Sequence, residues 1–431
     1  MVMQSPLTLV VFGATGDLYH NKLAFALFNL FSLGMLPEHF GIIGFSRRSL
    51  SNEDFQEFTK EAILKKNPDV ENSGTAGKDL AGFLSHLKYV QGDLENLEDF
   101  ISLGKELAAY DEKKGICTDK LFYLSTPPIL YATIFKNISL AGLTIPCAPG
   151  VEDRVKAWTR VLVEKPFGKN ILDAENLDQL LGELFDESQI FRIDHYLAKE
   201  ALQNILSFRF SEGTLEPVWN NRNIEKVRII FHEENLVGKR GALYDGLGAL
   251  RDVGQNHMLQ MLALVAMENP GTVSGSLVHK ARTAVLQKTS LVVDRGIVRG
   301  QYEGYLEEPN VNPESKIETF FRISLEVDNE RWKGVPFEFE AGKGLNEAQV
   351  KVEVYFKDNS KNHTFLISAN KKVPYDAHEK VLYDCIVGDQ TVFTTTAEIM
   401  AEWKIITDTI EAWQSVPLTI YKKGSAGVDI C

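Results

Sequence analysis

A continuous apolar run, Leu7–Phe12, leads directly into a glycine turn, Gly13–Asp17, and a helical pattern follows to about Leu33. A strand of apolar residues alone is typical of a parallel sheet that helices cover on both faces. Strand-like runs then recur between helical segments, at Gly41–Phe45, Leu84–Val90, Leu121–Leu124 and Arg160–Val163. This alternation predicts an α/β domain of the Rossmann type, with a doubly wound parallel sheet, over residues 1–194.

The pattern changes after about Asp194. Ile224–His232 is strand-like, and Gly241–Met267 has the pattern of one long helix. Alternating runs such as Phe320–Val327 and Val350–Phe356 follow, and alternation predicts antiparallel strands. Helical patterns return at Tyr375–Val387 and Ala397–Trp413. The sequence therefore predicts a second, α+β domain over residues 195–431, with a large, mainly antiparallel sheet flanked by helices.

The net charge of the 431-residue chain is −13, with a pI near 5.3. An acidic balance argues against general binding to nucleic acid or to an anionic membrane, but it allows a locally positive pocket for a small anion. No apolar run reaches the length of a membrane span. None of the four cysteines, Cys117, Cys147, Cys385 and Cys431, forms a C-x-x-C pair. We therefore expect reduced thiols in a cytoplasmic protein, and no metal site.

The glycine turn follows a strand and opens a helix, which is the setting of a dinucleotide site. Small residues such as Gly13 and Gly16 let backbone N–H groups approach a pyrophosphate, and the helix N-terminus adds a positive dipole. The third glycine of the full fingerprint is missing, because Tyr19 stands there. A plain tight turn between strand and helix therefore remains the alternative.

The residues after the second strand indicate which dinucleotide is preferred. An NAD site usually has an acid there for the ribose 2′-hydroxyl. This chain has Ser46-Arg47-Arg48-Ser49, without a carboxylate. Since guanidinium groups match phosphate oxygens, the sequence favours NADP over NAD, with Arg47 on the 2′-phosphate. The alternative is a solvated arginine pair in a loop.

Three segments concentrate ionisable residues, namely Glu164–Gly168 (EKPFG), Arg192–Glu200 (RIDHYLAKE) and Arg251–Gln260 (RDVGQNHMLQ). Lys165 follows a parallel strand, at the end where ligands bind. His195 and Lys199 lie about one helical turn apart and, with the Tyr196 hydroxyl, could hold a phosphate. His257 is a candidate base. Alternatively, Lys165 is a surface lysine, the segment with His195 and Lys199 is a solvated helix start, and His257 is a hydrogen-bonded core histidine.

These segments resemble the glucose-6-phosphate dehydrogenase family. The three segments above are similar to its signature segments and occur in the same order. Further similar segments are Gly13–Leu18, Arg299–Tyr302, Arg331–Pro336, Gly388–Phe393 and Tyr421–Gly427. The resemblance covers nearly the whole chain, and RIDHY with a downstream QNH is far more specific than a glycine turn.

The resemblance implies an NADP-dependent oxidation of glucose 6-phosphate at C1 to the 6-phospho lactone, the first step of the oxidative pentose phosphate pathway. His257 falls on the family's general base, and Asp194 falls on the carboxylate that orients it. Lys165 falls on a residue that touches both substrate and cofactor. A histidine suits the task because its pKa lies near neutrality, and a paired carboxylate raises that pKa.

The resemblance also implies the binding residues. His195, Tyr196 and Lys199 fall on the phosphate pocket, and the residues that fall on contacts to the sugar are Glu233, Asp252 and Lys343. The positions that fall on the cofactor site are Gly13, Thr15, Gly16, Asp17, Leu18, Arg47, Asp93, Leu94, Tyr123 and Lys165. A homodimer or tetramer is the implied assembly.

The chain departs from the family pattern at several positions. Tyr19-His20-Asn21 replaces a basic run, Glu340 replaces an arginine and Ala348 replaces a basic residue near Lys343. The stretch between Phe356 and Tyr375 is shorter than usual, so strands of the antiparallel sheet are expected to be missing. Because that sheet commonly builds the dimer interface, the departure puts the oligomer in doubt.

Three other functions stay open on the sequence alone. The first is the same C1 oxidation of another hexose or hexose phosphate, motivated by the lost basic residues near Lys343. The second is a non-catalytic nucleotide-binding relative, which the presence of Lys165, Asp194 and His257 together opposes. The third is a different sugar oxidoreductase that shares the domain plan, which the RIDHY and QNH segments oppose.

Overall fold

The computed structural model describes residues 5–70, 76–147, 157–210, 215–367 and 376–428. The chain forms two compact units. The first contains Met1–Gly168, Glu175–His195 and Val373–Thr394, and the second contains Lys169–Ala174, Tyr196–Lys372 and Thr395–Cys431. The chain therefore completes the first unit only after most of the second. The boundary between residues 194 and 195 stays a prediction.

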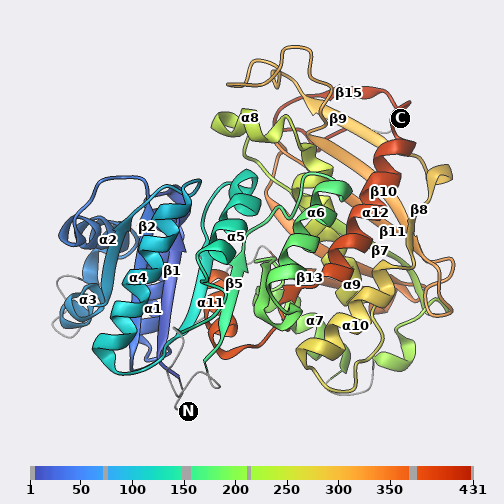
Figure 1. The fold of residues 1–431 in the computed structure, drawn as a ribbon. Coiled ribbons are helices and arrows are strands. Elements are labelled where there is room, and N and C mark those ends of the chain that lie inside the picture. The colour runs from blue at the N-terminus through green and yellow to red at the C-terminus, as the bar shows by residue number, and fades with distance from the viewer. Residues whose placement is uncertain (1–4, 71–75, 148–156, 211–214, 368–375, 429–431) are drawn as a thin grey trace. The chain divides into compact units, whose positions relative to one another are not determined.

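The first unit is built on a seven-stranded sheet in the order β14-β6-β5-β4-β1-β2-β3 (Figure 1). Its strands are β1 (Leu7–Phe12), β2 (Phe40–Ser46), β3 (Leu87–Gln91), β4 (Asp119–Leu124), β5 (Thr159–Val163), β6 (Ile190–Ile193) and β14 (Phe393–Thr394). All neighbours are parallel except β14 and β6, which are antiparallel. Every residue of β1 is buried, as expected for a strand covered on both faces. The predicted Rossmann-type sheet is confirmed.

Two groups of helices accompany this sheet. The helices are α1 (Ala24–Ser32), α2 (Asn52–Lys66), α3 (Ala76–Leu84), α4 (Leu97–Lys114), α5 (Tyr131–Leu140), most of α6 (Ile171–Leu184) and α11 (Ala377–Val387). Helix α1 packs beside α2, α3 and α11, whereas α4 packs beside α5. Ser51 and Asp54 form the capping box that the sequence predicts for α2. Tyr375, the predicted start of α11, lies outside the described residues.

The second unit is built on an eight-stranded sheet in the order β13-β12-β7-β11-β10-β9-β15, with β8 paired to β10. Its strands are β7 (Ile224–His232), β8 (Thr289–Leu291), β9 (Val298–Tyr302), β10 (Phe320–Val327), β11 (Phe337–Gly342), β12 (Gln349–Phe356), β13 (His363–Leu366) and β15 (Leu418–Tyr421). The pairs β11–β7 and β15–β9 are parallel, and the others are antiparallel. Burial alternates along β12, as its sequence predicts. A mainly antiparallel sheet is therefore confirmed.

A layer of helices accompanies this second sheet, as Figure 1 shows for α12 and α9. The helices are α7 (Glu200–Phe210), α8 (Gly241–Tyr244), the π-helix η8 (Leu250–Met258), α9 (Leu259–Ala266), α10 (Gly275–Leu286) and α12 (Thr396–Ala412). The π-helix contacts β7, β11 and α12. Residues of η8 are therefore held between the sheet and the rest of the helical layer.

The prediction of one long helix over Gly241–Met267 is wrong, because the segment is divided into α8, η8 and α9. Gly248 has a φ of +77°, where a right-handed helix cannot continue. The chain then resumes as a π-helix, whose wider turns are frequent at functional sites. Apolar spacing alone does not separate a π-helix from an α-helix, so the sequence pattern could not show this break.

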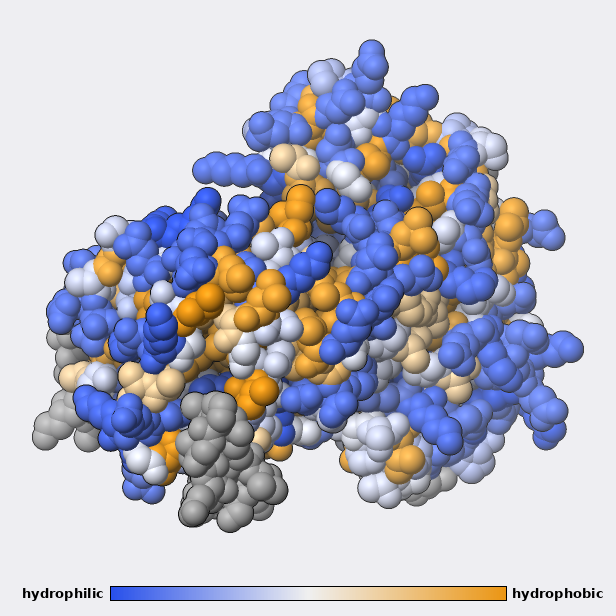
Figure 2. Space-filling model, viewed as in Figure 1, coloured by the Kyte–Doolittle hydropathy of each residue, from blue (hydrophilic) through white to orange (hydrophobic). Residues whose placement is uncertain are grey.

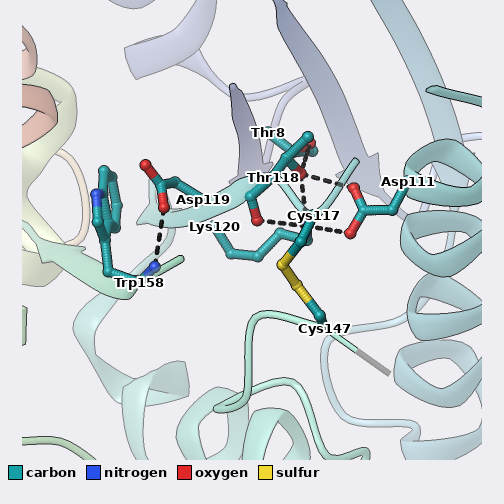
Figure 3. The surroundings of a disulfide bond; sticks show 8 residues. All are labelled: Thr8, Asp111, Cys117, Thr118, Asp119, Lys120, Cys147 and Trp158. Atoms are coloured by element: carbon teal, nitrogen blue, oxygen red, sulfur yellow. Dashed lines mark hydrogen bonds and ion pairs between the residues drawn. A yellow bond between two sulfur atoms is a disulfide. The ribbon is translucent and has the colours of Figure 1, made fainter. Parts of the chain in front are cut away.

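Cys117 and Cys147 form a disulfide in the first unit, with their Cα atoms 5.9 Å apart (Figure 3). The prediction of four reduced cysteines is therefore wrong for this pair. The Asp111 carboxylate lies near both sulfur atoms, but sulfurs joined in a disulfide offer no thiolate to a metal ion. The carboxylate accepts hydrogen bonds from Thr118 and Lys120, each at 2.7 Å, so we assign the cluster a structural role. Sequence spacing cannot reveal this pair, because the fold brings the entry to β4 next to the segment after α5.

Hydrophilic side chains predominate on the face of the molecule in Figure 2, with hydrophobic side chains in smaller groups between them. In the part of the chain that the structure describes, none of the helices combines the length and the apolar character needed to cross a bilayer. Cys431, the last residue, lies outside that part.

The disulfide leads to a prediction about thiols and stability. In a thiol titration of the unfolded chain, two of the four cysteines should react without reductant, and all four after reduction. Replacing Cys117 and Cys147 with serine should lower the free energy of unfolding by up to about 3–4 kcal/mol, because the bond closes a 30-residue loop. Denaturant melts of wild type and variant, each with and without reductant, measure this change. A reductant effect that persists in the double variant would contradict it.

Candidate functional site

The glycine turn after β1 needs glycine at its first position. Gly13 has a φ of +80°, and a Cβ atom there would overlap the carbonyl oxygen of Ser125, just beyond β4. The Thr15 hydroxyl lies 2.7 Å from the Ser46 hydroxyl at the end of β2. The turn is thus fitted closely to the carboxyl ends of both neighbouring strands, and its backbone can approach a phosphate where a side chain could not.

Arg47 and Arg48 follow directly after β2, and both side chains are exposed. Their backbone is held in place: the Tyr89 hydroxyl donates to the carbonyls of Ser46 and Arg48, at 2.9 and 2.6 Å. Two guanidinium groups therefore lie at the carboxyl edge of the sheet, next to the strand whose turn is fitted for a phosphate. This arrangement suits an anion on the ribose side of a dinucleotide.

Tyr19, one of the departures from the family pattern, is fully buried. Its hydroxyl lies 3.0 Å from Thr59 Oγ1 and its ring stacks on Phe55 and Phe58. Burial raises the pKa of the Tyr19 hydroxyl. This side chain therefore packs into the interior rather than toward the phosphate turn.

Tyr123 at the end of β4 is also buried, and its hydroxyl donates to Glu164 Oε1 at 2.5 Å. The Tyr131 hydroxyl donates to the Glu164 carbonyl at 3.0 Å, and burial raises the pKa of the Glu164 carboxyl. These contacts anchor the residue just before Lys165. Glu164 was missed as a site residue in the sequence, where its only signal was its place between a buried strand and Lys165.

The remaining cofactor candidates of the first unit lie along the same strand ends. Asp93 and Leu94 follow β3; the Leu94 carbonyl accepts from Asn137 Nδ2 at 3.1 Å, and Asp93 Oδ1 accepts from the Glu95 N–H at 3.0 Å. Asp17 is exposed and Leu18 half-buried, directly before the π-helix Tyr19–Leu23 that leads into α1. Since carboxyl ends of parallel strands are where such sheets bind ligands, this edge fits a dinucleotide.

In the second unit, His257 lies in the π-helix η8 and is 1% exposed. Its ring centroid is 4.2 Å from that of Tyr196 and 6.0 Å from that of Phe231. The side chain of Asn256 accepts the His257 backbone N–H at 2.7 Å. The imidazole is thus packed against two aromatic rings, with the backbone of its residue held by Asn256.

Lys343 joins the two candidate acids of the sugar site. Its ammonium lies 2.5 Å from Glu233 Oε2 and 3.5 Å from Asp252 Oδ2, and its side chain is 6% exposed. These residues come from the ends of β11 and β7 and from the first turn of η8. Three predicted substrate residues are therefore brought together, as a charged cluster able to hydrogen-bond to sugar hydroxyls.

The predicted phosphate and catalytic residues are divided between the two units. Tyr196 and Lys199 belong to the second unit, where the Lys199 ammonium lies 3.8 Å from the centre of the Tyr196 ring. His195 belongs to the first unit and stacks on His378, with ring centroids 5.8 Å apart. Asp194 is 2% exposed directly after β6, and Lys165 also lies in the first unit. The predicted set is thus distributed over both units.

Glu340 on β11 does not point toward His257. Side chains alternate along a strand. Phe231, whose partner on β11 is Ala341, faces His257, whereas Glu340 bonds to His232 on the other face of the sheet. There His232 Nε2 donates to Glu340 Oε1 at 2.9 Å, and Arg322 Nε donates to Oε2 at 2.6 Å. Ala348, another departure, is exposed. Glu340 is therefore part of a charged network on the opposite face of the sheet.

Comparison with known proteins gives one consistent family. Residues 10–204 match the family description "Glucose-6-phosphate dehydrogenase, NAD binding domain", and residues 206–373 and 362–430 match "Glucose-6-phosphate dehydrogenase, C-terminal domain". Glucose-6-phosphate 1-dehydrogenase from Chlamydia pneumoniae is 35% identical, over 98% of this chain and 93% of the relative. The Bacillus subtilis enzyme of the same name is 32% identical, over 98% and 95%.

Solved structures agree with the sequence relatives. A glucose-6-phosphate dehydrogenase in complex with its substrate glucose-6-phosphate superposes with a TM-score of 0.88 at 30% identity, covering 100% of this chain and 97% of that one. An aldose-aldose oxidoreductase from Caulobacter crescentus reaches a TM-score of 0.52 at 11% identity, which shows a shared fold alone.

The Glu340 network predicts a pH-dependent contribution to stability. Burial by itself would raise the pKa of this carboxyl, but the hydrogen bond from His232 and the charge of Arg322 lower it to about 2. A depressed pKa stabilises the folded state above the unfolded pKa near 4.5, and this stabilisation is lost as the pH falls toward 2. Glu340→Gln should therefore cost on the order of 3 kcal/mol at pH 7 and less than half of that near pH 3.

Urea melts of the wild type and Glu340→Gln across this pH range measure the difference. A difference that stays constant between pH 7 and pH 3 would show that the ionised carboxylate is not the stabilising group.

Proposed function

Because the chain belongs to the glucose-6-phosphate dehydrogenase family, its reaction is the NADP-dependent oxidation of glucose 6-phosphate at C1, and we propose that His257 is the general base. The observation that supports this role most directly is the buried imidazole on η8, about one turn after Asp252, whose carboxylate pairs with Lys343. A base beside acceptors for sugar hydroxyls is the arrangement that oxidation of a sugar carbon requires.

The proposed step moves one proton and one hydride from the sugar. His257 takes the proton of the C1 hydroxyl as the C1–H bond breaks and the C1–O bond gains double-bond character, which yields the lactone. The nicotinamide of the bound cofactor supplies the hydride acceptor for this chemistry. Asp194 is the carboxylate that orients the imidazole and stabilises its protonated form; its burial directly after β6 and its position in the RIDHY segment support this assignment.

We assign the substrate phosphate to His195, Tyr196 and Lys199. The Lys199 ammonium over the Tyr196 ring supplies positive charge, and the Tyr196 hydroxyl and the His195 imidazole supply hydrogen-bond donors, without a metal. Glu233, Asp252 and Lys343 take the sugar hydroxyls: the carboxylates accept hydrogen bonds and the ammonium donates them. Lys165, anchored through Glu164, contacts both substrate and cofactor in this proposal.

The packing around Gly13 tests whether the first unit could hold a dinucleotide phosphate, and the residues present fit one. A Cβ atom on Gly13 would overlap the Ser125 carbonyl oxygen, so this position must be glycine, and a glycine turn between a strand and a helix suits a phosphate. Gly13, Thr15, Gly16, Asp17 and Leu18 would hold the pyrophosphate. Arg47 would hold the 2′-phosphate, and Asp93, Leu94, Tyr123 and Lys165 would border the rest of the cofactor.

The compartment and the assembly are further parts of the proposal. We propose a cytoplasmic enzyme, in keeping with three plant relatives whose names include "cytoplasmic". A homodimer or tetramer rests on the family resemblance alone, and sedimentation of the purified chain would determine it.

His257→Asn tests the base. The variant should lower kcat about 10²–10⁴-fold while the KM for glucose 6-phosphate changes little, because asparagine keeps a hydrogen-bonding group but cannot take the proton. Steady-state reduction of NADP⁺, followed by near-UV absorbance, measures both constants. His363→Asn is the matched control, since His363 lies on β13 against Phe208 and has no part in the proposal. Near-normal turnover in a folded His257→Asn enzyme would refute the assignment.

Arg47→Ala tests the cofactor preference. Losing a charged hydrogen bond to the 2′-phosphate should raise the KM for NADP⁺ about 10- to 100-fold and leave the KM for NAD⁺ unchanged. Arg48→Ala, the neighbouring exposed arginine, is the control and should change the NADP⁺ KM far less. If the wild type reduces NAD⁺ as well as NADP⁺, or if the two variants behave alike, the assignment of Arg47 fails.

A further inference from the structure

Glu318, two residues before β10, is a buried acid without a role in the proposed reaction. The residue is 2% exposed. Its Oε1 atom accepts the backbone N–H of Leu250 at 3.0 Å, and its backbone carbonyl accepts the N–H of Ala249 at 3.0 Å. Leu250 is the first residue of η8. One residue therefore binds two successive N–H groups at the start of the π-helix, where a helix lacks internal partners.

The chain before η8 is shaped to make this contact. Gly248 has a φ of +77°, and a Cβ atom there would overlap the Glu318 carboxylate. Any other residue at position 248 would be strained and would push the carboxylate aside. The glycine and the acid are thus fitted to each other, two residues before the helix that carries Asp252 and His257.

The residue after Glu318 fixes the other side of the sugar cluster. The Thr319 carbonyl accepts the backbone N–H of Lys343 at 2.9 Å. The Thr319 hydroxyl lies 2.9 Å from the Tyr421 hydroxyl, which in turn donates to the Lys343 carbonyl at 2.6 Å. Lys343 is therefore held on both its N–H and its carbonyl. In the ion pair between Lys343 and Asp252, the backbone of Lys343 is therefore held by Thr319. Asp252 lies on η8, whose first residue is held by Glu318.

We propose that Glu318 is a positioning residue of the substrate site, which sets where η8 begins and thereby aligns Asp252 and His257 with Lys343. The inference rests on the proposed function, because it names the support for the same site. A displacement of about 1 Å in a reacting group can cost on the order of 100-fold in rate, so an anchor several residues away can control the reaction.

The Glu318 side chain holds η8 by accepting a hydrogen bond. Burial raises the pKa of the Glu318 carboxyl, against the Leu250 hydrogen bond and the charges of Arg251 and Arg299. A carboxyl oxygen accepts the Leu250 N–H in either protonation state. A glutamine, which has the same shape and keeps one acceptor oxygen, should therefore replace it, whereas an alanine should not.

The test compares Glu318→Ala and Glu318→Gln in the full chain, with glucose 6-phosphate and NADP⁺ varied separately. Glu318→Ala should raise the KM for glucose 6-phosphate and lower kcat, for a loss of about 100-fold in kcat/KM. The KM for NADP⁺ should stay within about twofold, and Glu318→Gln should stay within about threefold of wild type in every constant. Glu216→Ala, which removes an acid bonded to Arg209 and Arg331 elsewhere in the same unit, is the control for a merely structural loss.

Four results would overturn the inference. The first is a folded Glu318→Ala with wild-type constants, and the second is a Glu318→Ala that loses kcat with no change in the KM for glucose 6-phosphate. The third is an equal loss in Glu318→Ala and Glu318→Gln. The fourth is a Glu216→Ala that shows the same joint change in KM and kcat as Glu318→Ala. If Glu318→Ala does not fold, Gly248→Ala replaces it, since the added methyl displaces the carboxylate and should give the same joint change in KM and kcat. A wild type that does not oxidise glucose 6-phosphate would instead refute the proposed function.

Discussion

A buried ammonium group requires carboxylate partners, and Lys343 finds two of them in Glu233 and Asp252. Lys343 follows β11, Glu233 follows β7 and Asp252 lies in η8. Their ion pairs therefore join the ends of two neighbouring parallel strands to the start of a helix. Removing either acid would leave charge buried without full compensation. The sugar site is therefore also a point on which the second unit depends for its folded arrangement.

Features set by neighbouring residues could be predicted from the sequence. The apolar run Leu7–Phe12 became the interior strand β1 with the same bounds, and Ser51 with Asp54 became a capping box. The glycine turn was predicted because Gly13 follows a buried strand directly. In each case the physical cause lies within a few residues along the chain. The causes are a strand covered on both faces, a hydroxyl cap and a backbone without a Cβ atom.

Features set by distant residues could not be predicted. The π-helix η8 begins where it does because Gly248 meets Glu318, some seventy residues later in the chain. Cys117 and Cys147 meet only because β4 and α5 pack in one unit. The sequence placed His257 on a buried helix correctly, but its aromatic neighbours Tyr196 and Phe231 come from other elements. Local periodicity carries no information about such partners.

The return of Val373–Thr394 to the first unit has a consequence for protein synthesis. A ribosome releases the N-terminal part of a chain first, so β1 to β6 emerge well before α11 and β14. Until Phe393 and Thr394 arrive, β6 has an unpaired edge, and the Arg160 guanidinium lacks the carbonyls of Cys385 and Ile386 that it binds in the finished protein. An open strand edge invites wrong pairing with other chains. The first unit therefore stays an unfinished sheet, with an open edge at β6, until β14 is synthesised.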